Sequence, residues 1–106
     1  MKVSEAKELV IREAFEEDGI LHMSRTGESP SQPRMVVLLE AVRVLAKEYA
    51  PKDVVEKQLA FALQTLSVQI PVQLEIWKTQ GPIHPIDDAT VIDILSAIEQ
   101  FYTKKK

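Results

Sequence analysis

Residues 66–76 read LSVQIPVQLEI, and this stretch decides between an all-α fold and a mixed one. Every second position is apolar, and several of these residues are β-branched, which is a strand pattern. The alternating positions are Leu66, Val68, Ile70, Val72, Leu74 and Ile76. The stretch also continues a helical spacing that begins earlier in the chain, at Leu59, Leu63, Leu66, Ile70 and Trp77. Pro71 fits neither a helix interior nor a central strand, because it lacks the backbone N–H that both structures use.

A strand over 66–76 would also need a partner to pair with. The only other candidate in the chain is the short segment 19–24. We therefore favour a helix that is kinked or broken near Pro71, within a single all-α domain, 1–106, of four or five helices. The alternative is an α+β fold in which 66–76 is an edge strand that pairs with 19–24 or across a dimer.

The residues before this stretch predict two more helices. Apolar positions at helical spacing predict the first over 3–18, with Gly19 as its stop. Ser31 is the expected N-cap of the second, over about 33–49, with Pro33 in its first turn.

Acidic residues mark the beginnings of the later helices. Asp53 and Glu56 have the spacing of a capping box. Asp87 or Asp88 is expected to cap the last helix. The residues expected to face inward from that helix are Ile92, Leu95, Ile98 and either Phe101 or Tyr102.

Composition excludes several classes of protein. The chain has 106 residues, no cysteine, and 13 basic against 16 acidic residues, for a net charge of −3. The absence of cysteine excludes disulfides, thiolate metal sites and cysteine nucleophiles. The mildly acidic net charge argues against a nucleic-acid partner. We see no signal-peptide pattern and no run of about 20 apolar residues, so we expect a cytoplasmic protein without a membrane partner. No motif calls for a cofactor.

The segment 19–33, GILHMSRTGESPSQP, is the one long break in the helical pattern. Functional residues concentrate on such loops. The segment follows a cluster of acids at the end of the first helix, where the helix dipole disfavours negative charge. We predict a binding surface here, made of Glu16, Glu17, Asp18, His22, Arg25 and Arg34. In the alternative, Arg25 or Arg34 folds back to neutralise the acids, and the loop is structural.

Trp77 is the chain's single tryptophan, and it is a further candidate for the binding surface. Tryptophan often anchors protein interfaces, although it can equally close one end of a core. His84 with Asp87 and Asp88 has too few good ligands for a zinc site.

We expect a non-enzymatic interaction or regulatory domain whose partner is another protein or a second copy in a homodimer. The surplus apolar faces on 36–44 and 54–76 motivate this expectation, since a monomer rarely exposes a large apolar patch. One alternative is a magnesium-dependent phosphohydrolase that uses the carboxylates of Glu13, Glu16 and Glu17. A second alternative is a nucleic-acid-associated regulator that uses Arg25, Arg34 and the lysines at 104–106.

Overall fold

A computed structural model describes residues 1–52, 54–79 and 87–103. They form four α-helices and one 3₁₀ helix, η1: α1 (Val3–Phe15), η1 (Ile20–Thr26), α2 (Gln32–Tyr49), α3 (Lys57–Thr79) and α4 (Asp88–Thr103). No strand occurs within these ranges, so the all-α prediction is confirmed. Residues 66–76 lie wholly inside α3, and the edge-strand alternative is wrong. α3 also continues through Pro71 without a break in its helical assignment.

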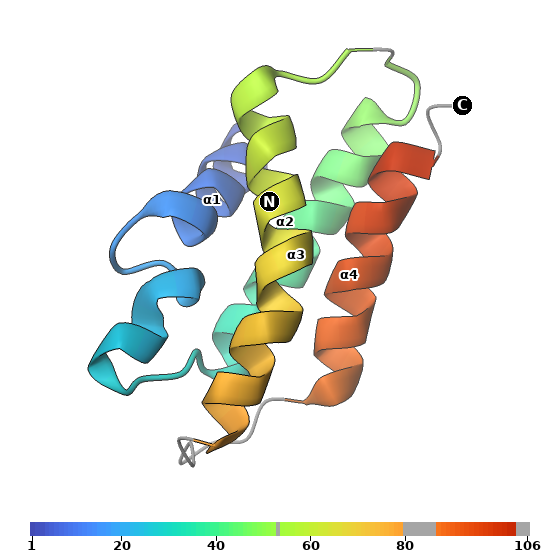
Figure 1. Cartoon of the computed structure of the whole chain (residues 1–106). Coiled ribbons are helices and arrows are strands. Elements are labelled where there is room, and N and C mark those ends of the chain that lie inside the picture. The colour runs from blue at the N-terminus through green and yellow to red at the C-terminus, as the bar shows by residue number, and fades with distance from the viewer. Residues whose placement is uncertain (53, 80–86, 104–106) are drawn as a thin grey trace.

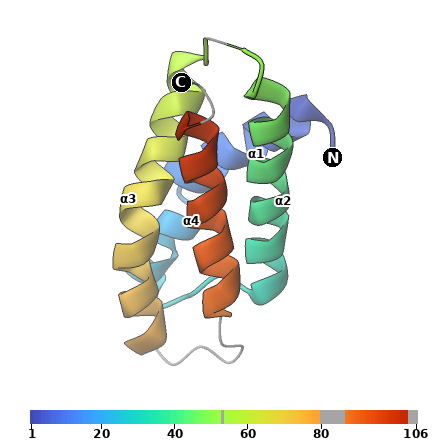
Figure 2. The same cartoon turned by 90° about the vertical axis from the view of Figure 1, so that its right-hand side faces the viewer.

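The helices α2, α3 and α4 run alternately up and down, and α1 crosses them at an angle, on the left in Figure 1 and behind the other three helices in Figure 2. α2 packs against α1 and α4, and α3 packs against α1, η1 and α4. α2 and α3 are therefore diagonal to each other, with α1 and α4 between them. The consequence is that α3 has neighbours on its inner side and flanks, while its outer side faces away from the bundle.

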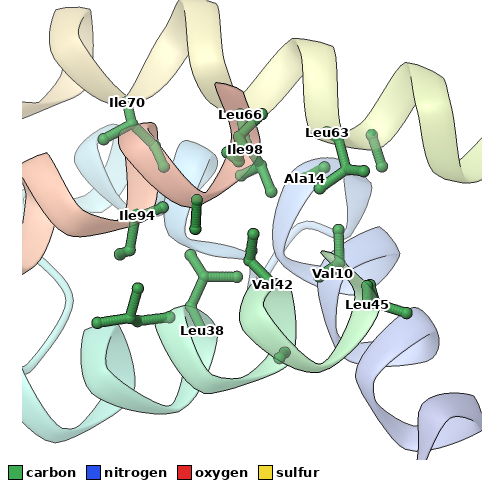
Figure 3. Close-up of a cluster of buried hydrophobic side chains, with 14 of the residues drawn as sticks. Val10, Ala14, Leu38, Val42, Leu45, Leu63, Leu66, Ile70, Ile94 and Ile98 are labelled. Atoms are coloured by element: carbon green, nitrogen blue, oxygen red, sulfur yellow. The ribbon is translucent and has the colours of Figure 1, made fainter. Parts of the chain in front are cut away.

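The core lies where the apolar stripes of the four helices meet (Figure 3). α3 contributes Leu63, Leu66 and Ile70, which lie opposite side chains from the other three helices. Those side chains include Val10 and Ala14 of α1, Leu38, Val42 and Leu45 of α2, and Ile94 and Ile98 of α4. The spacing of these residues at three and four positions is the one that puts apolar side chains on one helical face.

Two predicted caps are present. The Ser31 hydroxyl accepts a hydrogen bond from the backbone N–H of Arg34 at 3.3 Å. The Asp87 carboxylate accepts one from the N–H of Ala89 at 3.0 Å. The side-chain amide of Gln32 joins the beginnings of α2 and α4, because it accepts from the backbone N–H of Asp87 and donates to the Thr90 hydroxyl, both at 2.8 Å.

The first helix ends three residues earlier than predicted. α1 stops at Phe15, so 16–18 lie beyond its last turn. Gly19 does not act as a left-handed helix stop, because its φ is −71°. It is instead required by close packing: a Cβ here would lie 2.6 Å from the carbonyl oxygen of Glu13 and 2.7 Å from that of Arg12.

Glu56 does not serve in a capping box. α3 begins at Lys57, so Glu56 precedes the helix instead of lying in its first turn; Asp53 lies outside the described residues. The Glu56 carboxylate accepts hydrogen bonds from the Lys7 ammonium at 2.9 Å and from the Tyr49 hydroxyl at 2.5 Å. The Lys7 bond first, and the Tyr49 bond second, lower the pKa of Glu56 to about 2. These bonds tie the start of α3 to α1 and α2.

The inward face of α4 differs from the prediction. Ile92 is 60% exposed, and Tyr102 is also exposed and donates to the Ala60 carbonyl at 2.9 Å. The buried positions are Val91, Ile94, Ala97, Ile98 and Phe101. Both sets have helical spacing and share Ile98 and Phe101, and the predicted Leu95 is partly buried against the core. Periodicity alone therefore did not fix the full inward face of this strongly apolar helix.

Candidate functional site

Arg34 binds the end of α1 and does not point into solvent. Its guanidinium donates to both carboxylate oxygens of Glu13, from Nε at 2.8 Å and from Nη2 at 2.6 Å. Nη2 also donates to the backbone carbonyl of Asp18 at 2.5 Å. The Glu13 side chain is 5% exposed, and that of Arg34 is 34% exposed. The hydrogen bonds that Arg34 donates to Glu13 are the main cause that raises the pKa of Arg34.

This pair gives the loop after α1 a structural role. Ile20 and Leu21 are buried in the core just after the chain turns at Gly19. Arg34, which belongs to α2, stabilises the same turn by donating a hydrogen bond to the backbone carbonyl of Asp18. Arg34 is therefore not available as a free cation in the predicted binding surface. Its counter-charge is Glu13, a buried acid that the alternative magnesium hypothesis places among the metal ligands.

The three acids of the predicted surface are exposed. Glu16, Glu17 and Asp18 follow α1, and none of their carboxylates forms an ion pair with another described residue. Across the described ranges, no group of three histidine, aspartate or glutamate side chains is placed to hold a metal ion. Glu13, which the magnesium hypothesis needs, is already bound by Arg34. Glu16 and Glu17 therefore lack Glu13, which is the third carboxylate that the magnesium hypothesis uses.

The structure brings His22 and Arg25 together at an open groove of about 410 Å³. The groove lies between the end of α1, η1 and the middle of α3. Besides these two, its polar lining consists of Ser24, Thr65, Gln69 and Gln73. Ser24 donates to the Gln73 side chain at 2.9 Å, which fastens η1 to α3. The groove thus forms one border of the outer side of α3.

Trp77 lies in the core and cannot anchor an interface in this state. Its side chain is fully buried. The indole N–H has no hydrogen-bond partner among the described residues. Of the other residues weighed from the sequence, His84 and the lysines at 104–106 lie outside the described part of the chain.

The most apolar exposed surface follows the outer side of α3. We call it the α3 outer row, and it consists of Phe61, Thr65, Val68, Val72 and Ile76. Phe61 is 62% exposed, Val68 57% and Val72 52%. Phe61 meets a neighbour, Phe15, with ring centroids 5.3 Å apart. The spacing of four, three, four and four residues places all five positions on one helical face.

The outer row is uncharged as well as apolar. No Asp, Glu, Lys, Arg or His occurs from residue 58 to residue 74. Exposed helix faces usually carry charged side chains. The apolar pattern predicts a wide face on 54–76 but does not distinguish the residues that point outward. The 17-residue gap in charge, from 58 to 74, was the signal that could have located them.

The seven large apolar side chains that are exposed elsewhere in the described ranges are spread over several elements and form no comparable row on one helix. Val36 and Val37 are exposed near the start of α2, and Ile92 is exposed on α4. In the second helix, Ala41 is buried and Val44 is partly buried. Of the surplus apolar residues predicted over 36–44, Val36 and Val37 are therefore exposed, and Val44 alone packs partly against the core.

α3 is also the one described helix that is long and apolar enough to cross a membrane. Only 28% of the qualifying window is buried in the bundle. The helix nevertheless carries four glutamines, at positions 58, 64, 69 and 73, and the fold is compatible with a soluble protein.

No known protein family, no curated protein and no solved structure matches this chain.

Proposed function

We propose that this chain is a non-enzymatic protein-interaction domain whose contact surface is the α3 outer row. The observation that carries the proposal is a row of exposed apolar side chains on a face without charge. Leaving such a row in water is unfavourable, and burying it against a partner removes that cost.

The row has the shape of a helix-packing surface. Phe61 and Ile76 are 15 residues apart, which is about 22 Å at 1.5 Å per residue. Side chains that recur at three and four residues pack into the grooves of a second helix. The fitting partner is therefore an α-helix with its own uncharged apolar row, because a charged helix would have to bury its charges here without compensation.

A photo-crosslinking experiment tests this proposal. We would place a benzophenone amino acid at Val68 in the full chain, in the cell that naturally makes it. The matched control carries the same group at Ile92, which is equally exposed and apolar but lies on α4. We expect an adduct from Val68 alone, whose crosslinked peptide, identified by mass spectrometry, lies in an uncharged amphipathic helix. No adduct from Val68, or equal adducts from both positions, would contradict the proposal.

A further inference from the structure

We propose that the helix that packs on the α3 outer row is α3 of a second copy, in antiparallel orientation, which makes the protein a symmetric dimer. This inference rests on the proposed function and names its partner. It is carried by two features beyond the apolar character of the row. The spacing of its first four residues, four, three and four, is the same in both directions, and the charges that flank the uncharged segment are opposite in sign.

Four of the five residues of the row pair off in this orientation. A two-fold axis between Thr65 and Val68 sets Phe61 opposite Val72 of the partner subunit and Thr65 opposite Val68 of the partner subunit. Ile76 lies beyond this pairing, at the level of Lys57 of the partner subunit. The same patch serves both copies, as a two-fold interface requires.

The charges at the two ends of the row also match. Lys57 precedes the uncharged segment and Glu75 follows it. They are 18 residues apart, which is five turns at 3.6 residues per turn, so both lie on the same side of the row. Both are exposed, and neither forms an ion pair within the described part of the chain.

An antiparallel pair puts Lys57 of each copy beside Glu75 of the partner subunit. Two ion pairs of opposite charge then flank the apolar contact. A parallel two-fold pair would instead set Lys57 level with Lys57 of the partner subunit and Glu75 level with Glu75 of the partner subunit, so no ion pair of opposite charge would form. The charge pattern therefore selects the antiparallel arrangement.

A second copy fits this face better than a lipid surface does. The flanks of the row carry the amides of Gln64 and Gln69, which are exposed. Amides lose their water without replacement in hydrocarbon, whereas at a protein interface they form the polar rim. The lysines and arginines that line a membrane-binding helix are absent from residues 58–74.

The test is sedimentation equilibrium of the full chain over a wide concentration range. For one helix pair of this length we expect a dimer with a Kd on the order of 1–100 μM. Val68→Lys should weaken the dimer at least tenfold, because it buries a charge in the centre of the contact. Ile92→Lys is the matched control on α4, and it should leave the Kd unchanged.

Charge reversals then test the orientation. Lys57→Glu alone and Glu75→Lys alone should each weaken the dimer about tenfold at low salt, because each turns two attractions into repulsions. The double variant should recover the wild-type Kd, and an equimolar mixture of the two single variants should form a heterodimer. All these differences should shrink in high salt.

Each other outcome overturns a defined part of the proposal. Equal Kd values for the wild type, both single variants and the double variant would indicate a parallel or unrelated dimer and overturn the antiparallel pairing. A monomer at the highest concentration would overturn the dimer, while a helix of another protein crosslinked to Val68 would leave the proposed function standing. Binding to neutral phospholipid vesicles that Val68→Lys abolishes would assign the face to lipid and overturn both.

Discussion

Arg34 and Glu13 form a bidentate ion pair that joins α2 to the last turn of α1, with N–O distances of 2.8 and 2.6 Å. The pair is asymmetric, because Glu13 is almost fully buried and Arg34 is about one-third exposed. Removing the arginine leaves a buried carboxylate without its counter-charge, whereas removing both partners leaves no buried charge at this site.

Arg34→Ala should therefore lower the free energy of unfolding by about 2–4 kcal/mol. The double variant Glu13→Leu/Arg34→Met should lose less than Arg34→Ala alone, because apolar side chains of similar size replace the buried charges. Urea denaturation followed by circular dichroism measures both. Arg25→Ala is the control, since Arg25 is exposed and forms no ion pair with a described residue; we expect a change within about 0.5 kcal/mol. A double variant less stable than Arg34→Ala would refute this account of the pair.

Gly19→Ala should be much more harmful than the same change at Gly27. At Gly19 the new Cβ meets two backbone carbonyl oxygens at 2.6 and 2.7 Å, so the chain itself must move. We expect a loss of about 2–3 kcal/mol. At Gly27 the Cβ meets open space, and the cost is the positive φ of 76°, about 1 kcal/mol. Thermal unfolding of both variants measures the difference, and the opposite ranking would contradict the close-approach explanation.

The hydrogen bonds to Glu56 predict a dependence of stability on pH. Its folded pKa of about 2 is below the ordinary value of 4.5, so the folded state favours the charged form. The stabilisation is fully present above pH 4.5 and is lost as the pH falls from 4.5 towards 2. Glu56→Gln should cost about 1 kcal/mol at pH 7, a modest value because the carboxylate is half exposed to solvent.

The measurement for Glu56 is the difference in unfolding free energy between wild type and Glu56→Gln, at a series of pH values from 7 to about 2. This difference should be constant down to about pH 5 and then shrink. A difference that grows as the solution is acidified would be evidence against the lowered pKa of Glu56.

Pro71→Ala should make the protein more stable. Proline has no N–H to donate to the carbonyl of Ser67, one turn back in α3, and it is exposed, so its ring contributes little to the core. Alanine restores the donor, and we expect a gain of about 1–3 kcal/mol. Gln69→Ala is the control for an exposed change in the same helix and should stay within about 0.5 kcal/mol. Chemical denaturation decides the matter, and a loss of stability on replacing Pro71 would show that its ring has a packing role.

Trp77 gives a test of the core. Trp77→Ala should cost about 3–5 kcal/mol, because it leaves a large cavity. Trp77→Phe should cost clearly less, about 1–2 kcal/mol, since the indole N–H makes no hydrogen bond to a described residue and its loss is no penalty. The unfolding must be followed by circular dichroism, because both variants lack the fluorescent residue. Similar losses for the two variants would mean that the N–H, and not the ring volume, stabilises this site.

The sequence by itself did not predict η1, which forms inside the segment 19–33, and it left the number of helices at four or five. It did determine the all-α class and the approximate positions of the four α-helices. These features depend on local chemistry: apolar spacing at three and four residues, the side chains of Ser31 and Asp87 as caps, and the absence of a second strand to pair with 66–76. Helix formation needs only contacts between residues a turn apart, so the chain carries this information directly.

Only the tertiary structure decided which face of each apolar-rich helix turns inward. α3 has apolar residues on two faces and α4 on more than one, so periodicity did not distinguish Leu66 from Val68, or Ile94 from Ile92, as core positions. The choice depends on the neighbours that pack against each helix, and these lie far away in sequence. The same holds for Glu13, whose buried charge is stabilised by an arginine 21 residues later, and for the outer row of α3, which is exposed because α1, η1 and α4 cover only the other sides of that helix.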